Sequence, residues 1–415
     1  MDLSCNRRRL PVLGKLLLLG FEVLASLMVI SGCGSLSSNV ITRPKELDPA
    51  DMSRQTLPDI VATFARPFIE NGTNLGLVIG VLDGEDKRIF GYGKRSIASD
   101  APPDGDTIFA IGSVTKAFLS LIVHQLVQEG ALSLSDNLED LLPKDVELSD
   151  AARKITVGQL LTHSSGLPRQ PNDLQMFVSL INYTFTGENI YRHIDAHKVF
   201  EVLRDFDPDP DEVGAYRYSN IGSGILAKVV ELRTQKSLEV LLNEQILSRI
   251  GARDTAYHLT SEQSFRMAEG HVGDSPFFMS RNTPTAQWDM GNILSGAAGL
   301  YSTANDLLEF ARYRISLGSS AMKTTPIHKG ILSVSSKAAQ RSSYGWMVDD
   351  FDEYGAQIIF QYGIISGYSA YIGVEPNRKI AVVVLANNFN WDDYIGHSLL
   401  LTLAKRKTDQ RSTAP

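Results

Sequence analysis

The sequence predicts an α/β fold of the α+β type, with one antiparallel sheet formed from both chain ends and flanked by helices. A run rich in Val, Ile and Leu at 75–82 is followed by an Asp-Gly turn signal and a returning strand at 87–92. Near the other end, two more strand-like runs occupy 369–374 and 380–385. The residues between these two pairs have mainly helical and loop patterns, so we expect a mostly helical region inserted into the sheet.

Helix-like runs at 51–70 and 392–405 complete the body at its two ends. The chain has 415 residues, of which 43% are hydrophobic, so a single domain over 51–405 can bury a sizeable core. A solvated tail is expected at 406–415. The net charge is −7 and the body has no cluster of Lys and Arg, which argues against nucleic acid as a partner.

Residues 1–32 are predicted to form a secretory signal peptide. A basic start at 7–15 precedes an apolar run at 16–30, and small residues then lead to Cys33. The run Ile-Ser-Gly-Cys resembles the lipobox of bacterial lipoproteins, which implies that Cys33 is acylated and begins the mature protein. Residues 33–50 are polar and turn-rich, which is typical of a tether between membrane and domain.

This N-terminal pattern leaves two alternatives open, an uncleaved membrane anchor and a plain cleaved secretion signal. All three interpretations place the body outside the cytoplasm. We therefore expect a cell-envelope protein, anchored in the membrane as a lipoprotein, with its body on the periplasmic or extracellular face.

Several kinds of chemistry are excluded by residue types. The only cysteines are Cys5 and Cys33, so the body has no disulfide, no thiolate metal site and no cysteine nucleophile. The eight histidines show no zinc-binding spacing, and no phosphate-binding loop occurs, so no metal or other cofactor is expected. The Gly-x-Ser-x-Gly pattern of a nucleophile elbow is also missing.

A Ser-x-x-Lys motif remains, at Ser113 and Lys116. It opens an apolar helix-like run that continues to about 128, and Gly130 is placed to end that helix. Serine and lysine three residues apart share a helix face, and burial would lower the pKa of the lysine enough for it to accept the hydroxyl proton. The motif occurs again at 320–323, but there in a polar stretch that is expected to be a loop.

A second element is Tyr218-Ser219-Asn220. By itself this tripeptide indicates a turn before a helix. About a hundred residues after a Ser-x-x-Lys motif, however, a tyrosine can relay a proton to a leaving group, and an asparagine can hold the lysine and a substrate amide.

With these motifs the chain resembles the serine β-lactamase-related family, which includes class C β-lactamases, low-molecular-weight penicillin-binding proteins, D-aminopeptidases and related esterases. The resemblance covers about 75–403. The matching segments follow the family's order, at 109–116, 155–168, 216–224, 298–307 and 363–388.

The resemblance implies a role for each motif residue. Ser113 would be the acylated nucleophile, Lys116 its base and Tyr218 the proton relay. Asn220 would contact the lysine and the substrate. His163, in the second matching segment, would be structural.

The third family motif departs from the pattern. Family members carry Lys-Thr-Gly or His-x-Gly, and this chain has Gln361-Tyr362-Gly363. The resemblance implies that Gln361 and Gly363 contact substrate and that the backbone N–H groups of Ser113 and Ile364 form the oxyanion hole. Without a cation, this motif favours ester, amide or amidated-peptide substrates over β-lactams and peptides with a free carboxylate.

The sequence thus predicts an envelope serine hydrolase that acts through an acyl-enzyme on a peptide, amide, ester or β-lactam carbonyl. Its partners would be a small-molecule or peptide substrate, peptidoglycan included, and the membrane through the lipid anchor. The alternative is a catalytically degraded, penicillin-binding-protein-like module that binds cell-wall peptide or a protein partner.

Overall fold

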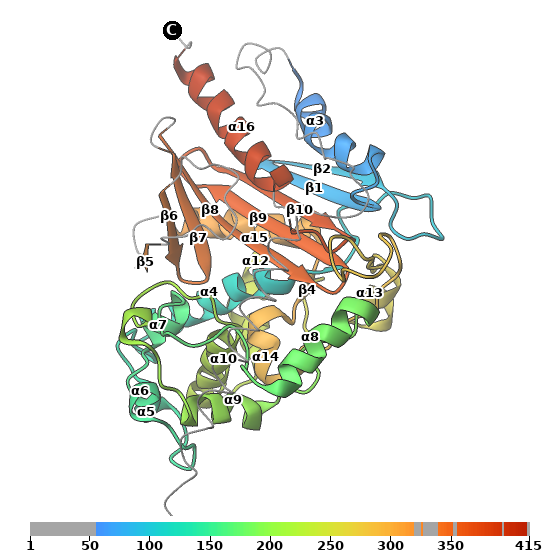
Figure 1. The fold of residues 1–415 in the computed structure, drawn as a ribbon. Helices are drawn as coiled ribbons and strands as arrows, with labels where there is room; N and C mark the ends of the chain where they lie inside the picture. The colour runs from blue at the N-terminus through green and yellow to red at the C-terminus, as the bar shows by residue number, and fades with distance from the viewer. Residues whose placement is uncertain (1–54, 319–324, 327–338, 352–354, 392–393, 413–415) are drawn as a thin grey trace, which may run out of the picture.

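The computed structural model describes residues 55–318, 325–326, 339–351, 355–391 and 394–412 (Figure 1). Within these residues, one antiparallel sheet holds eight strands in the order β2-β1-β10-β9-β8-β7-β6-β5, and β3 pairs separately with β4. The strands are β1 Gly76–Asp83, β2 Asp86–Gly93, β3 Phe109–Ala110, β4 Tyr301–Ser302, β5 Thr325–Pro326, β6 Ala339–Ser343, β7 Trp346–Phe351, β8 Ala356–Ile365, β9 Tyr368–Glu375 and β10 Ile380–Ala386.

The sheet joins the two ends of the chain as predicted. β1 pairs with β10 across its length, and Ile79 lies opposite Val384. Both strands are almost continuously apolar and buried, because helices cover both faces of the sheet. The hairpin β1–β2 and the hairpin β9–β10 both form where the sequence placed them.

Strands β5 to β8 extend the sheet beyond those predictions. Polar side chains hide the strand pattern of β6 and β7, and these side chains pair across the strands. Gln340 lies opposite Asp349 and donates to its Oδ1 at 3.0 Å, while Arg341 Nε donates to Asp350 at 2.9 Å. A strand that buries paired polar groups shows no apolar alternation, so periodicity could not identify it.

Helices form a layer on each side of the sheet. In Figure 1 α3 and α16 lie over one face, and the inserted helical region lies against the other, so the two cores are separate. The helices are α3 Leu57–Glu70, α4 Thr115–Gln128, α5 Leu138–Leu141, α6 Asp150–Arg153, α7 Val157–Leu161, α8 Leu174–Thr186, α9 Ala196–Arg204, α10 Asn220–Thr234, α11 Leu238–Leu242, α12 Ser248–Ile250, α13 Ser261–Phe265, α14 Gly291–Ala298, α15 Ala304–Ser316 and α16 Tyr394–Ser412. A 3₁₀ turn at Gly112–Val114 precedes α4.

The terminal helices differ in extent from the prediction. α3 begins at Leu57, where Thr56 forms a capping box with Asp59. α16 continues through residues expected to be a solvated tail, because Lys407 Nζ donates to the carbonyl oxygen of Arg378 at 3.0 Å. No helix in the described ranges is long and apolar enough to cross a membrane. The predicted signal, tether and Cys33, and the second Ser-x-x-Lys copy at 320–323, lie outside these ranges.

Candidate active site

The Ser-x-x-Lys motif forms the start of α4. Ser113 lies in the 3₁₀ turn and is partly exposed, whereas Lys116 lies one turn further on and is 2% exposed. Nearly every side chain of α4 is buried, and the exceptions, His124, Val127 and Gln128, lie toward its C-terminal end, so the helix runs through the core. The apolar run therefore places the serine at solvent and the lysine beneath it.

Lys116 Nζ contacts three oxygen atoms. It lies 3.1 Å from Ser113 Oγ, 3.0 Å from Asn220 Oδ1 and 2.7 Å from the carbonyl oxygen of Ala297. Burial, and after it the charge of Arg169, holds the pKa of Lys116 well below its usual range. The amide and carbonyl oxygens only accept hydrogen bonds, so they take both hydrogens of a neutral amine. The lone pair of the amine is then directed at Ser113 Oγ.

Tyr218, in the turn before α10, contacts the same serine. Its hydroxyl donates to Ser113 Oγ at 2.6 Å, and Lys116 Nζ lies 4.8 Å from the centroid of its ring. The tyrosine precedes Ser219, whose side chain accepts from Gly222 N at 2.8 Å and caps α10. Burial raises the pKa of Tyr218, so its phenol stays protonated at neutral pH. The predicted turn before a helix is confirmed.

His163 supports the Tyr218 turn. Its Nδ1 accepts from Ser219 N at 3.3 Å, and its ring lies 4.5 Å from that of Tyr218, centroid to centroid. Burial, followed by the charges of Lys116 and Arg169, lowers the pKa of His163 to about 3, so the ring is neutral. The placement agrees with the structural role expected for this histidine.

Asn220 is held in one orientation by a residue that sequence reasoning missed. Its Nδ2 donates to the hydroxyl of Tyr191 at 3.1 Å, so its Oδ1 is the atom that faces Lys116. Tyr191 lies in the loop after α8, and its sequence context carries no signal for this role. Both ends of the Asn220 amide are used within the protein, and its expected contact with substrate stays a prediction.

Gly112 and Gly363 allow β8 to approach the nucleophile turn. A Cβ on Gly363 would lie 2.0 Å from the carbonyl oxygen of Ile111 and 2.9 Å from Ser113 N. A Cβ on Gly112, whose φ is +49°, would lie 2.8 Å from Ile364 N. The N–H-bearing nitrogens of Ser113 and Ile364 therefore lie at the same junction, as an oxyanion hole requires.

Gln361 lies in β8, two residues before Gly363, and is buried. Its Nε2 donates to the carbonyl oxygen of Gly345, and its Oε1 accepts from Tyr362 N at 2.9 Å. In the part of the chain that the structure describes, no hydrogen bond joins Gln361 to Ser113, Lys116 or Tyr218. The side chain that replaces the family's cation is thus directed at the backbone, and its contact with substrate stays a prediction.

Arg169 brings a positive charge that sequence reasoning missed. Its guanidinium carbon lies 5.2 Å from the centroid of the Tyr218 ring, its side chain is exposed, and its carbonyl oxygen accepts from Asn220 N at 3.1 Å. No carboxylate in the described ranges forms a salt bridge with it. It directly follows Pro168, the last residue of the second matching segment, and this position was the only available signal.

The segment at 297–303 forms hydrogen bonds with the turn that carries Ser113. Ile111 N donates to the carbonyl oxygen of Leu300 at 3.0 Å, and Leu300 N donates to Thr115 Oγ1 at 3.1 Å. Ala297, in the same segment, supplies the carbonyl that contacts Lys116. These contacts give the matching segment at 298–307, which has no catalytic side chain, a role in positioning the Ser-x-x-Lys motif.

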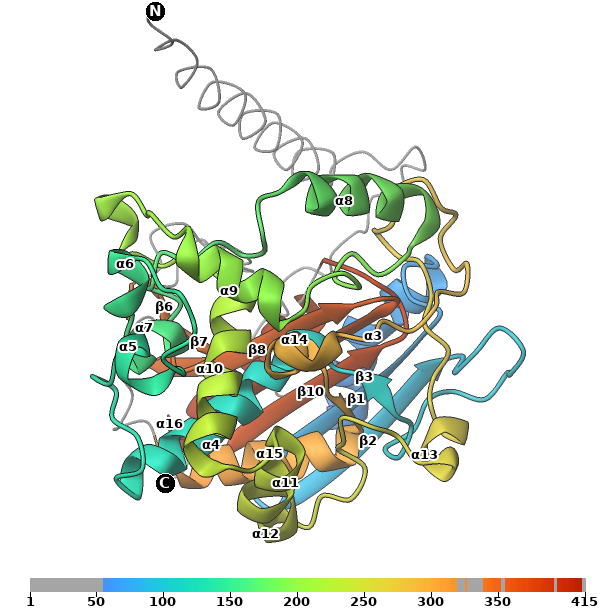
Figure 2. The ribbon, with the colours of Figure 1, turned by 90° about the horizontal axis from the view of Figure 1, so that it is seen from below.

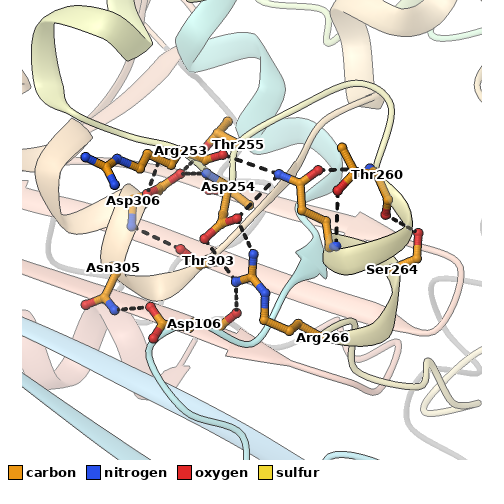
Figure 3. Close-up of polar contacts among 12 residues, drawn as sticks. Asp106, Arg253, Asp254, Thr255, Thr260, Ser264, Arg266, Thr303, Asn305 and Asp306 are labelled. Atoms are coloured by element: carbon orange, nitrogen blue, oxygen red, sulfur yellow. Dashed lines mark hydrogen bonds and ion pairs between the residues drawn. The ribbon is translucent and has the colours of Figure 1, made fainter.

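A polar network fixes that segment to the rest of the body (Figure 3). Asp306, near the start of α15, accepts from Asp254 N at 2.8 Å and from Thr255 Oγ1 at 2.9 Å. Arg266 bridges Asp254 and the carbonyl oxygen of Asp106, the latter at 2.9 Å. The network joins the loop before β3 to the residues after β4 and to the loop at 253–255, so it supports the position of β3, which precedes Ser113.

The described residues contain no group of three or more His, Cys, Asp and Glu side chains that could hold a metal ion. The cluster offers a partly exposed hydroxyl, a buried amine of lowered pKa, a protonated phenol and two backbone nitrogens at the close approach of β8 to the nucleophile turn. Such a set can form and hydrolyse an ester on a serine.

Comparison with known proteins agrees with this chemistry. A family model described as Beta-lactamase matches residues 61–404. Penicillin-binding protein 4 of Amycolatopsis lactamdurans is 28% identical over 304 residues, which are 68% of this chain and 72% of that protein. The D-alanyl-D-alanine-carboxypeptidase/endopeptidase AmpH of Escherichia coli strain K12 is 26% identical over 259 residues, which are 62% of each chain.

Solved structures share the fold. A class C β-lactamase from Rhodobacter sphaeroides has a TM-score of 0.66 at 21% identity, over 84% of this chain and 99% of that one. The octameric penicillin-binding protein homologue from Pyrococcus abyssi also has a TM-score of 0.66, at 23% identity, over 84% of this chain and 78% of that one. Since the first alignment spans almost a whole solved chain, the described body contains a complete fold.

Proposed function

Because this chain belongs to the beta-lactamase family and is a serine hydrolase of that family, we propose that it acts through an acyl-enzyme on Ser113, with Lys116 as the base and Tyr218 as the proton relay. The observation that carries the proposal is the environment of Lys116 Nζ. Two acceptor-only oxygens fix the hydrogens of the amine, and its lone pair is left for Ser113. A module that only binds has no use for a desolvated amine in this orientation.

Acylation follows from these contacts. Ser113 Oγ bonds to the substrate carbonyl carbon while its proton passes to Lys116, and the oxyanion forms beside the N–H groups of Ser113 and Ile364. Collapse of this intermediate restores the carbonyl and breaks the bond to the leaving group, which takes the Tyr218 proton. The proton on Lys116 then restores the phenol. Attack by water on the ester, with the same groups in reverse, releases the acid and returns the proton to Ser113.

Arg169 favours substrates that carry a carboxylate, whereas the neutral third motif by itself favoured uncharged ones. The motif predicted neutral substrates because Gln361 carries no charge. The Arg169 guanidinium over the Tyr218 ring restores a cation near Ser113, and an exposed arginine without a carboxylate partner among the described residues matches a substrate carboxylate in geometry and charge. We therefore propose an acyl donor that bears a carboxylate, such as a cell-wall peptide or a β-lactam. The names of the penicillin-binding protein and the carboxypeptidase among the relatives support this class.

Replacing Arg169 by Gln should weaken turnover of carboxylate-bearing substrates about tenfold or more, and turnover of neutral esters much less. Because the positive charge of Arg169 lowers the pKa of Lys116, the rising limb of the pH profile of kcat/KM should also move to higher pH. Steady-state rates on a penicillin and on a nitrophenyl ester, measured across pH, check both effects.

Arg192, an exposed arginine in the loop after α8, provides the control. It is paired with Glu188 at 2.6 Å, so Arg192→Gln should leave both substrates and the pH limb unchanged. Equal losses on charged and neutral substrates in Arg169→Gln would contradict the assignment, because they would indicate a general packing role.

We also propose that the enzyme works in the cell envelope, held by a lipid on Cys33. The support is the order of basic, apolar and small residues before this cysteine, followed by a polar tether to the body. This location would bring peptidoglycan peptides within reach. Metabolic labelling with a palmitate analogue tests the anchor, and incorporation that persists in Cys33→Ser would contradict it.

The direct test of the function is hydrolysis by the purified wild-type body. Release of free acid from a nitrophenyl ester, a penicillin or a D-alanyl-D-alanine peptide, at more than one turnover per molecule, would establish the hydrolase. Binding of the same ligands without any turnover would instead support the degraded binding module.

A further inference from the structure

Helix α8 presents a row of exposed apolar side chains. Leu174, Val178, Ile181 and Phe185 follow one another at helical spacing and are 40% to 68% exposed. The opposite face is apolar as well, since Met176 is fully buried and the Tyr183 ring packs against Trp288 at 5.3 Å. The helix LQMFVSLINYTFT contains no charged residue.

The apolar row continues onto a neighbouring loop. Phe278 stacks on Phe185 with ring centroids 4.6 Å apart, and Phe277 lies edge-on to Phe278 at 5.0 Å. The main chain joins the two segments, because Phe278 N donates to the carbonyl oxygen of Thr184 at 2.9 Å. We call these six side chains the α8 patch: Leu174, Val178, Ile181, Phe185, Phe277 and Phe278. Figure 2 shows α8 along the outer margin of the helical region.

A helix that is apolar on both faces is stable only when both faces leave water. Among the described residues, the body covers one face of α8 and leaves the other exposed, so that face calls for a partner. An apolar surface without charges, such as the α8 patch, suits the boundary between headgroups and acyl chains of a bilayer, because binding there requires no complementary charges. A protein partner would in general meet polar groups at the rim of the patch.

The N-terminal part of the chain favours the bilayer as this partner. The predicted lipid site at Cys33 is followed by residues 34–54, which can span up to about 70 Å when extended. The body then begins with α3, and the loop after α3 contacts the loop of the patch, because Arg281 Nη1 donates to the carbonyl oxygen of Thr73 at 2.8 Å. The α8 patch is therefore within reach of the membrane that would hold the anchor.

We propose that the α8 patch rests in the interfacial region of the membrane and that this contact orients the body. The proposal rests on the envelope location proposed above. α8 begins five residues after Arg169, so this contact would keep that arginine close to the bilayer surface. A contact of this kind depends on apolar burial and not on lipid charge.

The test is sedimentation of the body, residues 51–415, with phosphatidylcholine vesicles at low and high salt. This part of the chain contains the complete fold, so it can be prepared without the anchor. The wild-type body should sediment with neutral vesicles equally at both salt concentrations. The variant Val178→Gln/Ile181→Gln/Phe185→Gln should lower the bound fraction about tenfold or more, since glutamine keeps the helix and removes the apolar side chains.

Phe265→Gln is the matched control. This phenylalanine is 82% exposed on α13, outside the patch, so its loss should leave vesicle binding unchanged. A folded wild-type body that remains in the supernatant would overturn the proposal. If the wild-type body forms a dimer that becomes monomeric in the triple variant, and does not bind vesicles, the proposal is overturned, and a second copy of the chain is the partner of the patch. Fluorophosphonate labelling of the triple variant should persist, which separates this outcome from a failure of the active-site assignment.

Discussion

Replacing Ser113 by alanine should reduce hydrolysis of every substrate by roughly 10⁴-fold or more. The variant keeps the Lys116 amine, the Tyr218 phenol and the backbone N–H groups at 113 and 364, but no atom remains to form the ester. The loss should therefore appear in kcat, and binding of an unreactive ligand should change little. Steady-state kinetics and equilibrium binding on the same preparation separate the two quantities.

Ser120→Ala is the control for this variant. Ser120 lies on the same helix, is buried, and, among the described residues, donates from its hydroxyl to the carbonyl oxygen of Ala117 at 2.9 Å. Its loss should leave turnover within a few-fold of wild type. Turnover by Ser113→Ala within tenfold of wild type would show that another group performs the attack.

Replacing Lys116 should cost about 10²–10⁴-fold in kcat/KM. Lys116→Met removes the amine at similar length, and Lys116→Arg keeps the charge in a group that stays protonated. If Lys116 only supplied positive charge, arginine would restore much of the rate. Because the base must be neutral, we expect both variants to be equally poor between pH 6 and pH 9.

The pH profile of the wild type follows from the same requirement. Activity is present above the pKa of Lys116 and is lost as pH falls through it. Burial and Arg169 hold that pKa well below its usual range, so activity should persist to a much lower pH than an ordinary lysine base would allow. Lys228, half-buried on α10, gives the control Lys228→Met, which should keep both rate and profile. An arginine variant that recovers the wild-type rate would contradict the role of Lys116 as base.

Much of the fold was predictable because its pattern is local. Strands β1 and β10 are almost continuous apolar runs and β9 is mostly apolar, all three next to turn signals, and the turn before α10 carries its own capping serine. Helix α4 was evident from its apolar run and the glycine that follows it. Strands β6 and β7 were missed since Gln340 and Asp349 satisfy each other across the sheet, which only the paired structure reveals.

The chemistry of the site divides in a similar way. Ser113, Lys116 and Tyr218 were found from motifs, and the structure brings them together. The carbonyl of Ala297 could not be found, because a backbone oxygen has no sequence signature. Arg169 is close in space to Tyr218 but distant in sequence, so its charge could not be weighed against the neutral Gln361 before the fold was known.

The most direct test of the central claim is mass spectrometry of the folded body after exposure to benzylpenicillin and, separately, to a fluorophosphonate, with the adduct mapped by proteolysis. The account predicts one adduct per molecule on Ser113 with at least one of the two probes, and none in Ser113→Ala. Labelling by penicillin would support the carboxylate-bearing substrates assigned to Arg169. A folded wild-type protein that carries no adduct, or an adduct mapped to Ser320 in the second motif, would contradict the account.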